Sequence, residues 1–306
     1  MKRVMAFPSP RVWSLARLSL GFTLDEVAAG LAGLDPMDAL LVLAINQANI
    51  APLTRDPDAR RAYGGLEHAA PDSVRRPATV NAIANSLGVP FETARRRLKR
   101  LEAAGVCQVS PSAGVMVPEA WLTSPAYLDS VRAAHERLVK LYADLLAADL
   151  LDPLPPAAYA VDDGVPMRGA ARLIADFILR SVENLHRVAG DLTSALALLA
   201  VLDAALEPAD SAVRHGAASA SSLARRAGLP GETMRRHLVM LIETGVCART
   251  AQGVTVAPDL LSRPHIQALI EEHAADLQRL FAGLAERGVV AAWERAGAGL
   301  APRRRA

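Results

Sequence analysis

The chain has 306 residues, of which 51% are hydrophobic and 22% charged, and its formal net charge is +2. This length exceeds one typical domain, so we expect two units, and a composition rich in Ala, Leu and Arg favours helices. The small net charge excludes a uniformly basic nucleic-acid binder, so any DNA-binding surface must concentrate its cations locally.

The beginning of the chain lacks the features of a targeting segment. Residues 1–20 are interrupted by two prolines and two internal arginines, so they lack the apolar run of a signal peptide. The longest apolar runs, 37–45 and 192–202, are shorter than the ~20 residues that cross a bilayer. We therefore expect a cytoplasmic protein with no membrane partner.

In chain order, helical periodicity predicts a helix over residues 16–32 and a short helix from the N-cap Thr79 to about Ser86. Gly88 suits a left-handed turn after the short helix, and Pro90 suits the start of the next one. That next helix has an inward stripe at helical spacing, formed by Ala94, Leu98 and Leu101.

The outer face of this next helix carries residues suited to DNA. Residues 91–103 hold five basic and two acidic side chains, a formal charge of +3. Arginine can bond guanine in a bidentate manner, and a hydroxyl near the helix start can bond a phosphate or a base edge. The predicted DNA contacts are Glu92, Thr93, Arg95, Arg96, Lys99 and Arg100, with Lys99 and Arg100 expected to reach phosphates.

A ribbon, a long helix and a linker follow. Gly105 ends the helix, and residues 106–109 and 115–117 around a polar turn predict a two-stranded ribbon. A long helix is predicted over 125–151, and residues 151–167, with four prolines, are predicted to be a linker.

The chain then repeats itself. Residues 220–247 match residues 80–107 without a gap at a constant offset of 140, with 12 identities in 28 positions. The similarity extends to predicted helices over 171–188 and 265–286, and it pairs Phe22 with Phe177 and Tyr142 with Phe281. An Arg-rich helix face is often merely solvated, but its repetition inside a duplicated motif favours function.

The two copies differ in charge. Thr233, Arg235 and Arg236 repeat the first copy. His237, which replaces Arg97, is included as a phosphate contact, with packing at the surface or flank of the helix as the favoured alternative. Residues 231–243 have a formal charge of zero. We expect copy one to dominate affinity and copy two to read a different or weaker half-site; the alternative is that copy two has lost DNA binding and serves as a pairing surface.

The motif Leu87-Gly88-Val89-Pro90, followed by Glu92-Thr93-Ala94-Arg95-Arg96, resembles the reading heads of bacterial winged helix-turn-helix transcription regulators of the IclR, GntR and MarR types. The resemblance covers about 28 residues in each copy. It implies that the threonine and the two arginines of each copy enter the major groove. The flanking helices are similar to those that join MarR-type dimers, so the chain resembles such a dimer fused into one polypeptide.

The predicted fold is therefore mainly α with small β-hairpin wings: two tandem winged helix-turn-helix domains related by internal duplication and joined by flanking helices. The first unit spans 1–150 and holds an insertion within about 52–77. The linker covers 151–167, the second unit 168–290, and a basic tail 291–306.

The function predicted from this pattern is sequence-specific binding of double-stranded DNA by a nucleoid-associated transcription regulator. Two unequal recognition helices predict an imperfect inverted repeat or two unlike half-sites. The alternatives are a plasmid-type replication initiator and a tandem winged-helix scaffold that binds protein. Self-association through the terminal helices and a small-molecule effector are left open.

Other features point away from catalysis. The sequence has no glycine-rich phosphate loop, nucleophile elbow or convergent carboxylate pair, so we expect no enzyme activity and no cofactor. The seven histidines lack the spacing of zinc ligands, so no metal is expected. Arg76 is predicted to be either an arm toward DNA or part of a solvated loop. Cys107 and Cys247 are predicted to be small buried hydrophobes rather than redox sensors.

Overall fold

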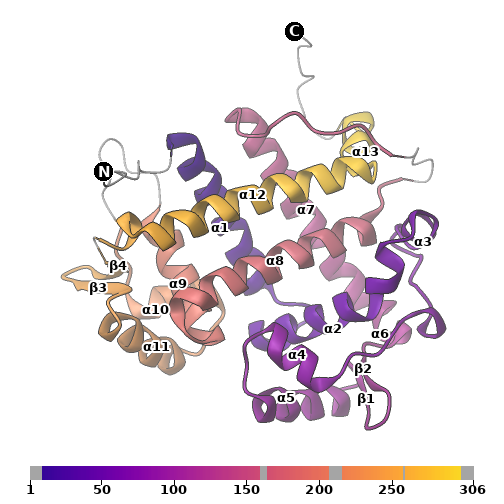
Figure 1. The fold of residues 1–306 in the computed structure, drawn as a ribbon, viewed down its shortest axis with the longest axis horizontal. Coiled ribbons are helices and arrows are strands. Elements are labelled where there is room, and N and C mark those ends of the chain that lie inside the picture. Colours follow the sequence, from indigo (N-terminus) through magenta and orange to yellow (C-terminus); the bar gives the residue numbers. More distant parts are fainter. Residues whose placement is uncertain (1–8, 159–163, 207–215, 258, 298–306) are drawn as a thin grey trace, which may run out of the picture.

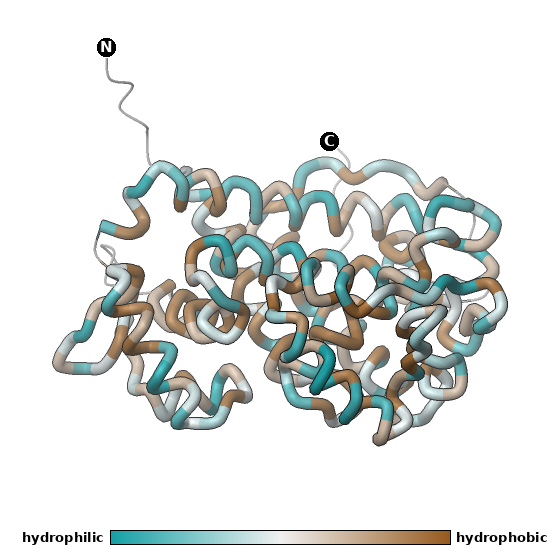
Figure 2. The backbone as a smooth tube through the Cα atoms, turned by 60° about the horizontal axis from the view of Figure 1, so that its bottom comes forward, coloured by the Kyte–Doolittle hydropathy of each residue, from teal (hydrophilic) through white to brown (hydrophobic). Residues whose placement is uncertain are grey.

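The computed structural model describes residues 9–158, 164–206, 216–257 and 259–297. In these ranges the chain is mainly helical, with two small antiparallel two-stranded sheets, which confirms the coarse fold class predicted from the sequence. Figure 1 shows a body of long helices, with two smaller groups of helices and strands side by side beneath it. In Figure 2 the two groups again lie next to each other on one side of the body.

We call the first group head one (residues 36–54 and 78–117). It consists of α2 (Pro36–Thr54), α4 (Val80–Ser86), α5 (Phe91–Ala103), β1 (Gln108–Ser110) and β2 (Gly114–Met116). Asp35 caps α2 and Thr79 caps α4, each by accepting a backbone N–H bond. Gly88 has φ +61°, the left-handed turn expected between α4 and α5. Ala78 pairs with Val115, so a third short segment joins the β1–β2 sheet.

Head two (residues 192–205 and 218–256) has the same order of elements. It consists of α9 (Leu192–Ala205), α10 (Ala220–Ala227), α11 (Gly231–Glu243), β3 (Cys247–Thr250) and β4 (Gly253–Val256). Asp191 caps α9 and Ser219 caps α10, and Gly228 has φ +64° in the turn. Ala218 pairs with Val254, as Ala78 pairs with Val115 in head one. The two heads therefore share caps, turn and sheet pairing.

The body consists of α1 (Pro10–Ala29), α7 (Pro125–Ala147), α8 (Met167–Ala189) and α12 (Pro264–Glu286). Helices α1 and α8 each pack against both α7 and α12. Helix α1 also packs against α9 and α10 of head two, and α8 packs against α2 of head one. Because α1 also packs against α2 and α8 against α9, each head contacts the first helices of both halves of the chain.

Residues that the sequence alignment pairs with each other meet at the centre of the body. The rings of Phe22 and Phe177 lie 6.3 Å apart between centroids. Those of Tyr142 and Phe281 are stacked, with centroids 5.5 Å apart. All four side chains are buried.

The predicted insertion is ordered and contacts the body. It contains the end of α2, the short helix α3 (Pro57–Ala62) and a 3-10 turn, η1 (Asp72–Val74). The carbonyl of Gly64 accepts bonds from the backbone N–H groups of Arg168 and Gly169 at the start of α8. The remaining short elements are α6 (Glu119–Leu122), η2 (Leu260–Ser262) and α13 (Val289–Arg295).

The basic tail predicted from residue 291 was wrong at its beginning. Residues 291–295 belong to α13, where Trp293 is buried and donates from Nε1 to Nε2 of His135 over 2.8 Å. Residues 298–306 lie outside the described residues, as do 159–163 of the predicted linker. Taken singly, none of the described helices is both long and apolar enough to cross a membrane; only α8 and α9 together reach that length and composition, across a bend of 99°.

Candidate nucleic-acid interface

Helix α5 presents one buried and one exposed face, as its sequence predicts. Ala94, Leu98 and Leu101 are buried in the core of head one. Glu92, Arg95, Arg96 and Lys99 are exposed on the other side, and Thr93 is half-buried. Because the apolar stripe fixes the rotation of the helix, the exposed side chains point away from the body.

On both helices, the first of the two exposed arginines forms an ion pair with a glutamate three residues earlier. Arg95 donates from Nε and Nη2 to Oε2 of Glu92, over 2.9 and 2.8 Å. Arg235 donates to Oε2 of Glu232 over 2.6 Å. The hydrogen bond from Arg95 lowers the pKa of Glu92 below its ordinary value. Both arginines are therefore held at the start of their helices by a carboxylate three residues earlier.

The remaining cations of α5 differ in their partners. Arg97 and Arg100 both donate to the carboxylate of Asp38, Arg97 over 2.6 Å. Arg100 is thus paired with α2 in this structure although 60% of its side chain is exposed, and its contact with a phosphate stays a prediction. Among the described residues, Arg96 and Lys99 have no ion pair or side-chain hydrogen bond.

Helix α11 repeats the exposed arginines but not the rest of the face. Arg235 and Arg236 are exposed and Thr233 is half-buried. Val239 and Met240 are also exposed, at 43% and 41% of their surface, where α5 has Lys99 and Arg100. The exposed face of α11 is therefore half cationic and half apolar.

Of the two predicted roles of His237, the structure favours packing at the flank of the helix over contact with DNA. Only 7% of His237 is exposed, and its Nδ1 lies 2.8 Å from Oγ of Ser194. Burial, the larger effect, lowers the pKa of His237, and the nearby Asp191 carboxylate opposes the shift. The ring is therefore part of the junction between α9 and α11 rather than of the surface.

The acidic side of these junctions was not predicted from the sequence. Asp35 and Asp38 in head one occupy the positions of Asp191 and Ser194 in head two, at an offset of 156. Where head one pairs Asp38 with Arg97, head two pairs Ser194 with His237. The sequence signal for this contact was that both partners change together between the copies: Asp38 and Arg97 in the first are replaced by Ser194 and His237 in the second.

Arg76 is exposed, but its backbone is fixed. Its N–H donates to the carbonyl of Asn49 over 3.0 Å, and its own carbonyl accepts from Nδ2 of Asn49 over 2.9 Å. The neighbouring Arg75 is buried and donates to the carbonyl of Val117 and to Asp72. Residues 75 and 76 are thus anchored beside β2. Only the side chain of Arg76 can reach outward.

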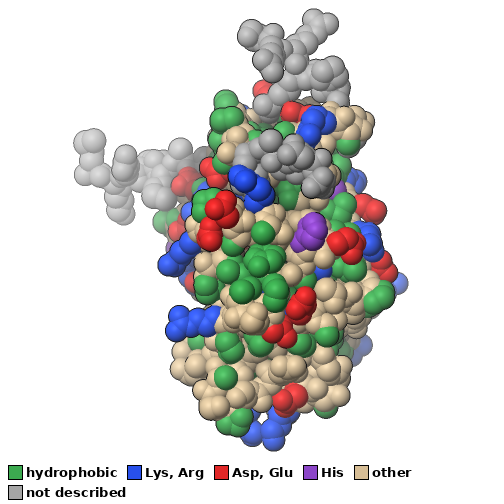
Figure 3. Space-filling model, turned by 90° about the vertical axis from the view of Figure 1, so that its right-hand side faces the viewer, with side chains coloured by type: hydrophobic (Ala, Val, Ile, Leu, Met, Phe, Trp, Pro, Cys, Tyr) green, Lys and Arg blue, Asp and Glu red, His purple; other side chains and the backbone are tan. Residues whose placement is uncertain are grey.

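The flank on the side of head one is not uniformly cationic. Figure 3 shows acidic and basic side chains interspersed around a hydrophobic area on this flank. Wing one (108–116) has no charged residue, whereas wing two (247–256) has the exposed Arg249, which was not among the predicted contacts. The cations that could face DNA therefore include those of α5, the start of α11 and wing two.

Neither cysteine is placed for redox chemistry. Cys107 and Cys247 are free and buried, and burial raises the pKa of each thiol to about 12. Within the described ranges, no group of three or more His, Cys, Asp or Glu side chains is arranged to hold a metal ion. Comparisons with models of protein families, with curated proteins and with solved structures found no match.

Proposed function

We propose that the chain is a sequence-specific regulator of transcription that binds double-stranded DNA through α5 and α11. The observation that carries this proposal is the pair of adjacent exposed arginines on each helix, Arg95 and Arg96 on α5 and Arg235 and Arg236 on α11. Both helices lie on the same side of the body (Figures 1 and 2). One duplex could therefore meet both helices without a rearrangement of the fold.

The same proposal interprets the chain as two winged helix-turn-helix units that arose by internal duplication. The equal caps, turns and sheet pairings of the two heads support this interpretation. The contacts of Phe22 with Phe177 and of Tyr142 with Phe281 support it further, because the alignment pairs the same residues. In this view the molecule corresponds to a two-fold dimer fused into one chain.

The chemistry of the exposed face suits a major groove. Arginine near the start of a recognition helix can bond O6 and N7 of guanine, and Lys99, one turn later, can neutralise a phosphate. Glu92 can release Arg95 to the DNA and accept a bond from the N4 amino group of cytosine. Because α11 lacks cations after Arg236, the two half-sites should differ in sequence and in strength.

A binding assay on paired variants tests the proposal. Arg95→Ala with Arg96→Ala should weaken binding to a selected DNA site at least tenfold and reduce its salt dependence. The matched control is Arg132→Ala with Lys140→Ala, which removes two exposed cations from α7. Selection from random duplexes would identify the site. Unchanged affinity and salt dependence in the α5 variant, or equal losses in the control, would contradict the proposal.

A second role for head two is favoured by the exposed Val239 and Met240. Exposed apolar side chains on a recognition helix suit contact with a protein rather than with phosphates. Val239→Lys with Met240→Arg would place on α11 the cations that α5 carries. Stronger DNA binding by this variant would show that head two faces the duplex, whereas unchanged affinity would favour the protein-binding role.

A further inference from the structure

Most of the large apolar side chains that are exposed among the described residues lie on the two candidate recognition helices. Phe91 on α5 is 45% exposed, and Val239 and Met240 on α11 are 43% and 41% exposed. Val74 in η1, at 41%, is the fourth. A single exposed apolar residue needs no explanation, whereas a concentration on these two helices indicates a surface that a partner covers.

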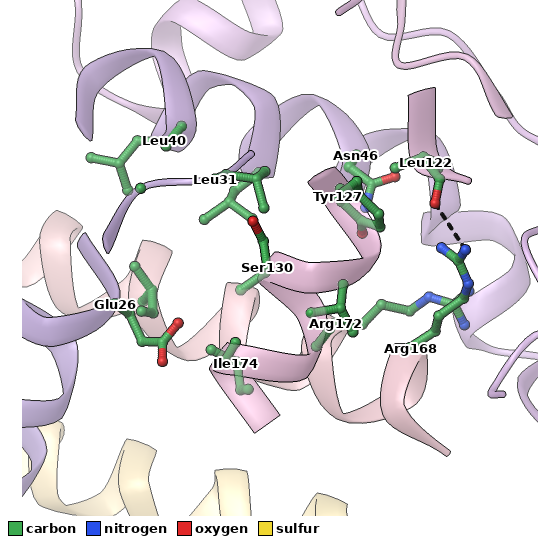
Figure 4. Close-up of a pocket in the computed structure, with 18 of the residues that line it drawn as sticks. Glu26, Leu31, Leu40, Asn46, Leu122, Tyr127, Ser130, Arg168, Arg172 and Ile174 are labelled. Carbon is green, nitrogen blue, oxygen red and sulfur yellow. Dashed lines mark hydrogen bonds between the residues drawn. The ribbon is translucent and has the colours of Figure 1, made fainter. Parts of the chain in front are cut away.

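The other apolar side chains around α5 face the interior. On the same helix, Leu98 is 1% exposed. Where head one meets the body, Leu31, Leu40 and Ile174 line a pocket between α1, α2, α7 and α8 (Figure 4), and all three are buried. Phe91 is thus an exception among its apolar neighbours, because nearly half of its surface is exposed.

The other half of the chain shows that the fold does not need an aromatic ring at this position. Gly231 occupies the corresponding place at the start of α11, at an offset of 140. The preceding prolines, Pro90 and Pro230, have nearly equal backbone angles, with φ −56° and −58° and ψ 137° in both. A Cβ added at Gly231 would meet no atom within 4 Å. The same turn and helix start therefore form without this side chain, which leaves the ring of Phe91 available to a partner.

Phe91 lies beside the arginine proposed to read guanine. Residues four apart on a helix are neighbours, with Cβ atoms about 5–6 Å apart, so Phe91 adjoins Arg95. Successive bases of one DNA strand are about 3.4 Å apart along the axis, so two such side chains can reach bases one or two positions apart. The N-terminal residues of a recognition helix are those that meet base edges. Phe91 precedes the arginines of its helix, whereas Val239 and Met240 follow theirs.

The chemistry of the major groove limits what a phenyl ring can recognise there. The ring has no conventional hydrogen-bond donor or acceptor, so it cannot satisfy the polar edge of a base. Among the four unmodified bases, thymine alone presents a methyl group in this groove. A phenyl ring that covers this methyl group removes apolar surface of both partners from water.

We propose that Phe91 is a specificity-determining residue that reads the 5-methyl group of a thymine, one or two positions from the guanine bound by Arg95. This inference rests on the proposed function, because it assigns one more base contact to α5. Gly231 has no side chain to make such a contact, so the half-site of head two should show no thymine preference at the corresponding position. If Phe91 served a protein partner instead, removal of the thymine methyl group would have no effect.

Deoxyuridine substitution tests the inference on the full chain, because it removes only the methyl group and keeps the base pair. The probe is the duplex selected from random sequences. Half-site one is the part of this duplex whose hydroxyl-radical footprint is lost in Arg95→Ala with Arg96→Ala. Each thymine of half-site one is replaced in turn, and affinity is measured by fluorescence anisotropy. One replacement should weaken binding about fourfold, the factor expected when one methyl group is no longer buried.

Three variants show whether Phe91 is the reader. Phe91→Ala should bind the thymine and deoxyuridine duplexes equally, and Gly231→Phe should gain a thymine preference in half-site two. Val74→Ala is the matched control, since Val74 is similarly exposed but lies in η1, and it should keep the fourfold ratio of the unaltered chain. Because each variant is compared on two duplexes, a general loss of stability would weaken both affinities and leave their ratio unchanged.

The inference is overturned if no deoxyuridine replacement in half-site one weakens binding, or if Phe91→Ala keeps the ratio of the unaltered chain. In either case a loss of affinity in Arg95→Ala with Arg96→Ala would still support the proposed function. If no duplex is selected from random sequences, the proposed function and this inference both fail.

Discussion

Asp38→Asn tests how firmly α5 is held against α2 in head one. The Asp38 side chain is only 6% exposed, whereas those of its partners Arg97 and Arg100 are 23% and 60% exposed. Asparagine keeps the size of the side chain but removes the charge that both guanidinium groups share. The substitution therefore isolates the ion pairs from packing.

The expected loss lies between two limits. Breaking a fully buried ion pair costs about 3–5 kcal/mol, and an exposed pair contributes at most about 1 kcal/mol. Here the arginines left behind can reach water, and Asp35 remains within 3.3 Å of Arg97 and 3.4 Å of Arg100. We therefore expect the free energy of unfolding to fall by about 2 kcal/mol.

Urea unfolding followed by circular dichroism measures this loss, and double-mutant cycles divide it between the two arginines. The coupling of Asp38 to Arg97 should exceed its coupling to Arg100, because Arg97 is less exposed. Ser194→Ala, at the corresponding position of head two, removes a bond to His237 and one to the Asp191 carboxylate, and it should cost about 1–2 kcal/mol. A loss below about 0.5 kcal/mol for Asp38→Asn, or equal couplings, would refute the reasoning.

Two further changes test other parts of the structure. Gly253→Ala should lower the free energy of unfolding in urea by about 2–4 kcal/mol. Gly253 has φ +139°, and a Cβ there would lie 2.3 Å from the carbonyl oxygen of Ala218. Gly231→Ala is the control and should cost nothing, because the space around Gly231 is open. Burial lowers the pKa of His273 to about 4, so the folded chain resists a proton that the unfolded chain binds below about pH 6.5. Stability should therefore be complete above about pH 6.5 and fall by about 3 kcal/mol toward about pH 4, with a smaller fall in His273→Gln.

Local signals in the sequence predicted most of the architecture. The N-caps Thr79 and Ser219, the turn glycines and the apolar stripe of α5 act over a few residues, so they can be recognised without the tertiary structure. The repeat set Phe22 and Phe177 at equivalent positions, but their contact is known only from the structure. Caps, turns and apolar stripes depend on residues close together in the chain, so they could be predicted from the aligned sequences alone.

The partners of the charged side chains could not be found in this way. Arg100 and Asp38 are 62 residues apart, and the rotamer that joins them depends on how α5 crosses α2. The burial of His237 depends on the same crossing in head two. The burial of Arg168 was missed for a related reason, because a helix sequence does not show whether a cation faces solvent or the interior.

Under the proposed duplication, the two halves of the chain carry different residues at corresponding positions, which the identical subunits of a homodimer cannot do. A homodimer must use each residue twice, so a cationic pocket or a charged junction appears in both halves or in neither. Here head one has the Asp38 ion pairs, whereas in head two Ser194 bonds both His237 and the Asp191 carboxylate. One pocket is lined by Arg168, and a second pocket is lined by Trp13. Fusion allows one half to bind its own half-site while the other half keeps the shape of the molecule.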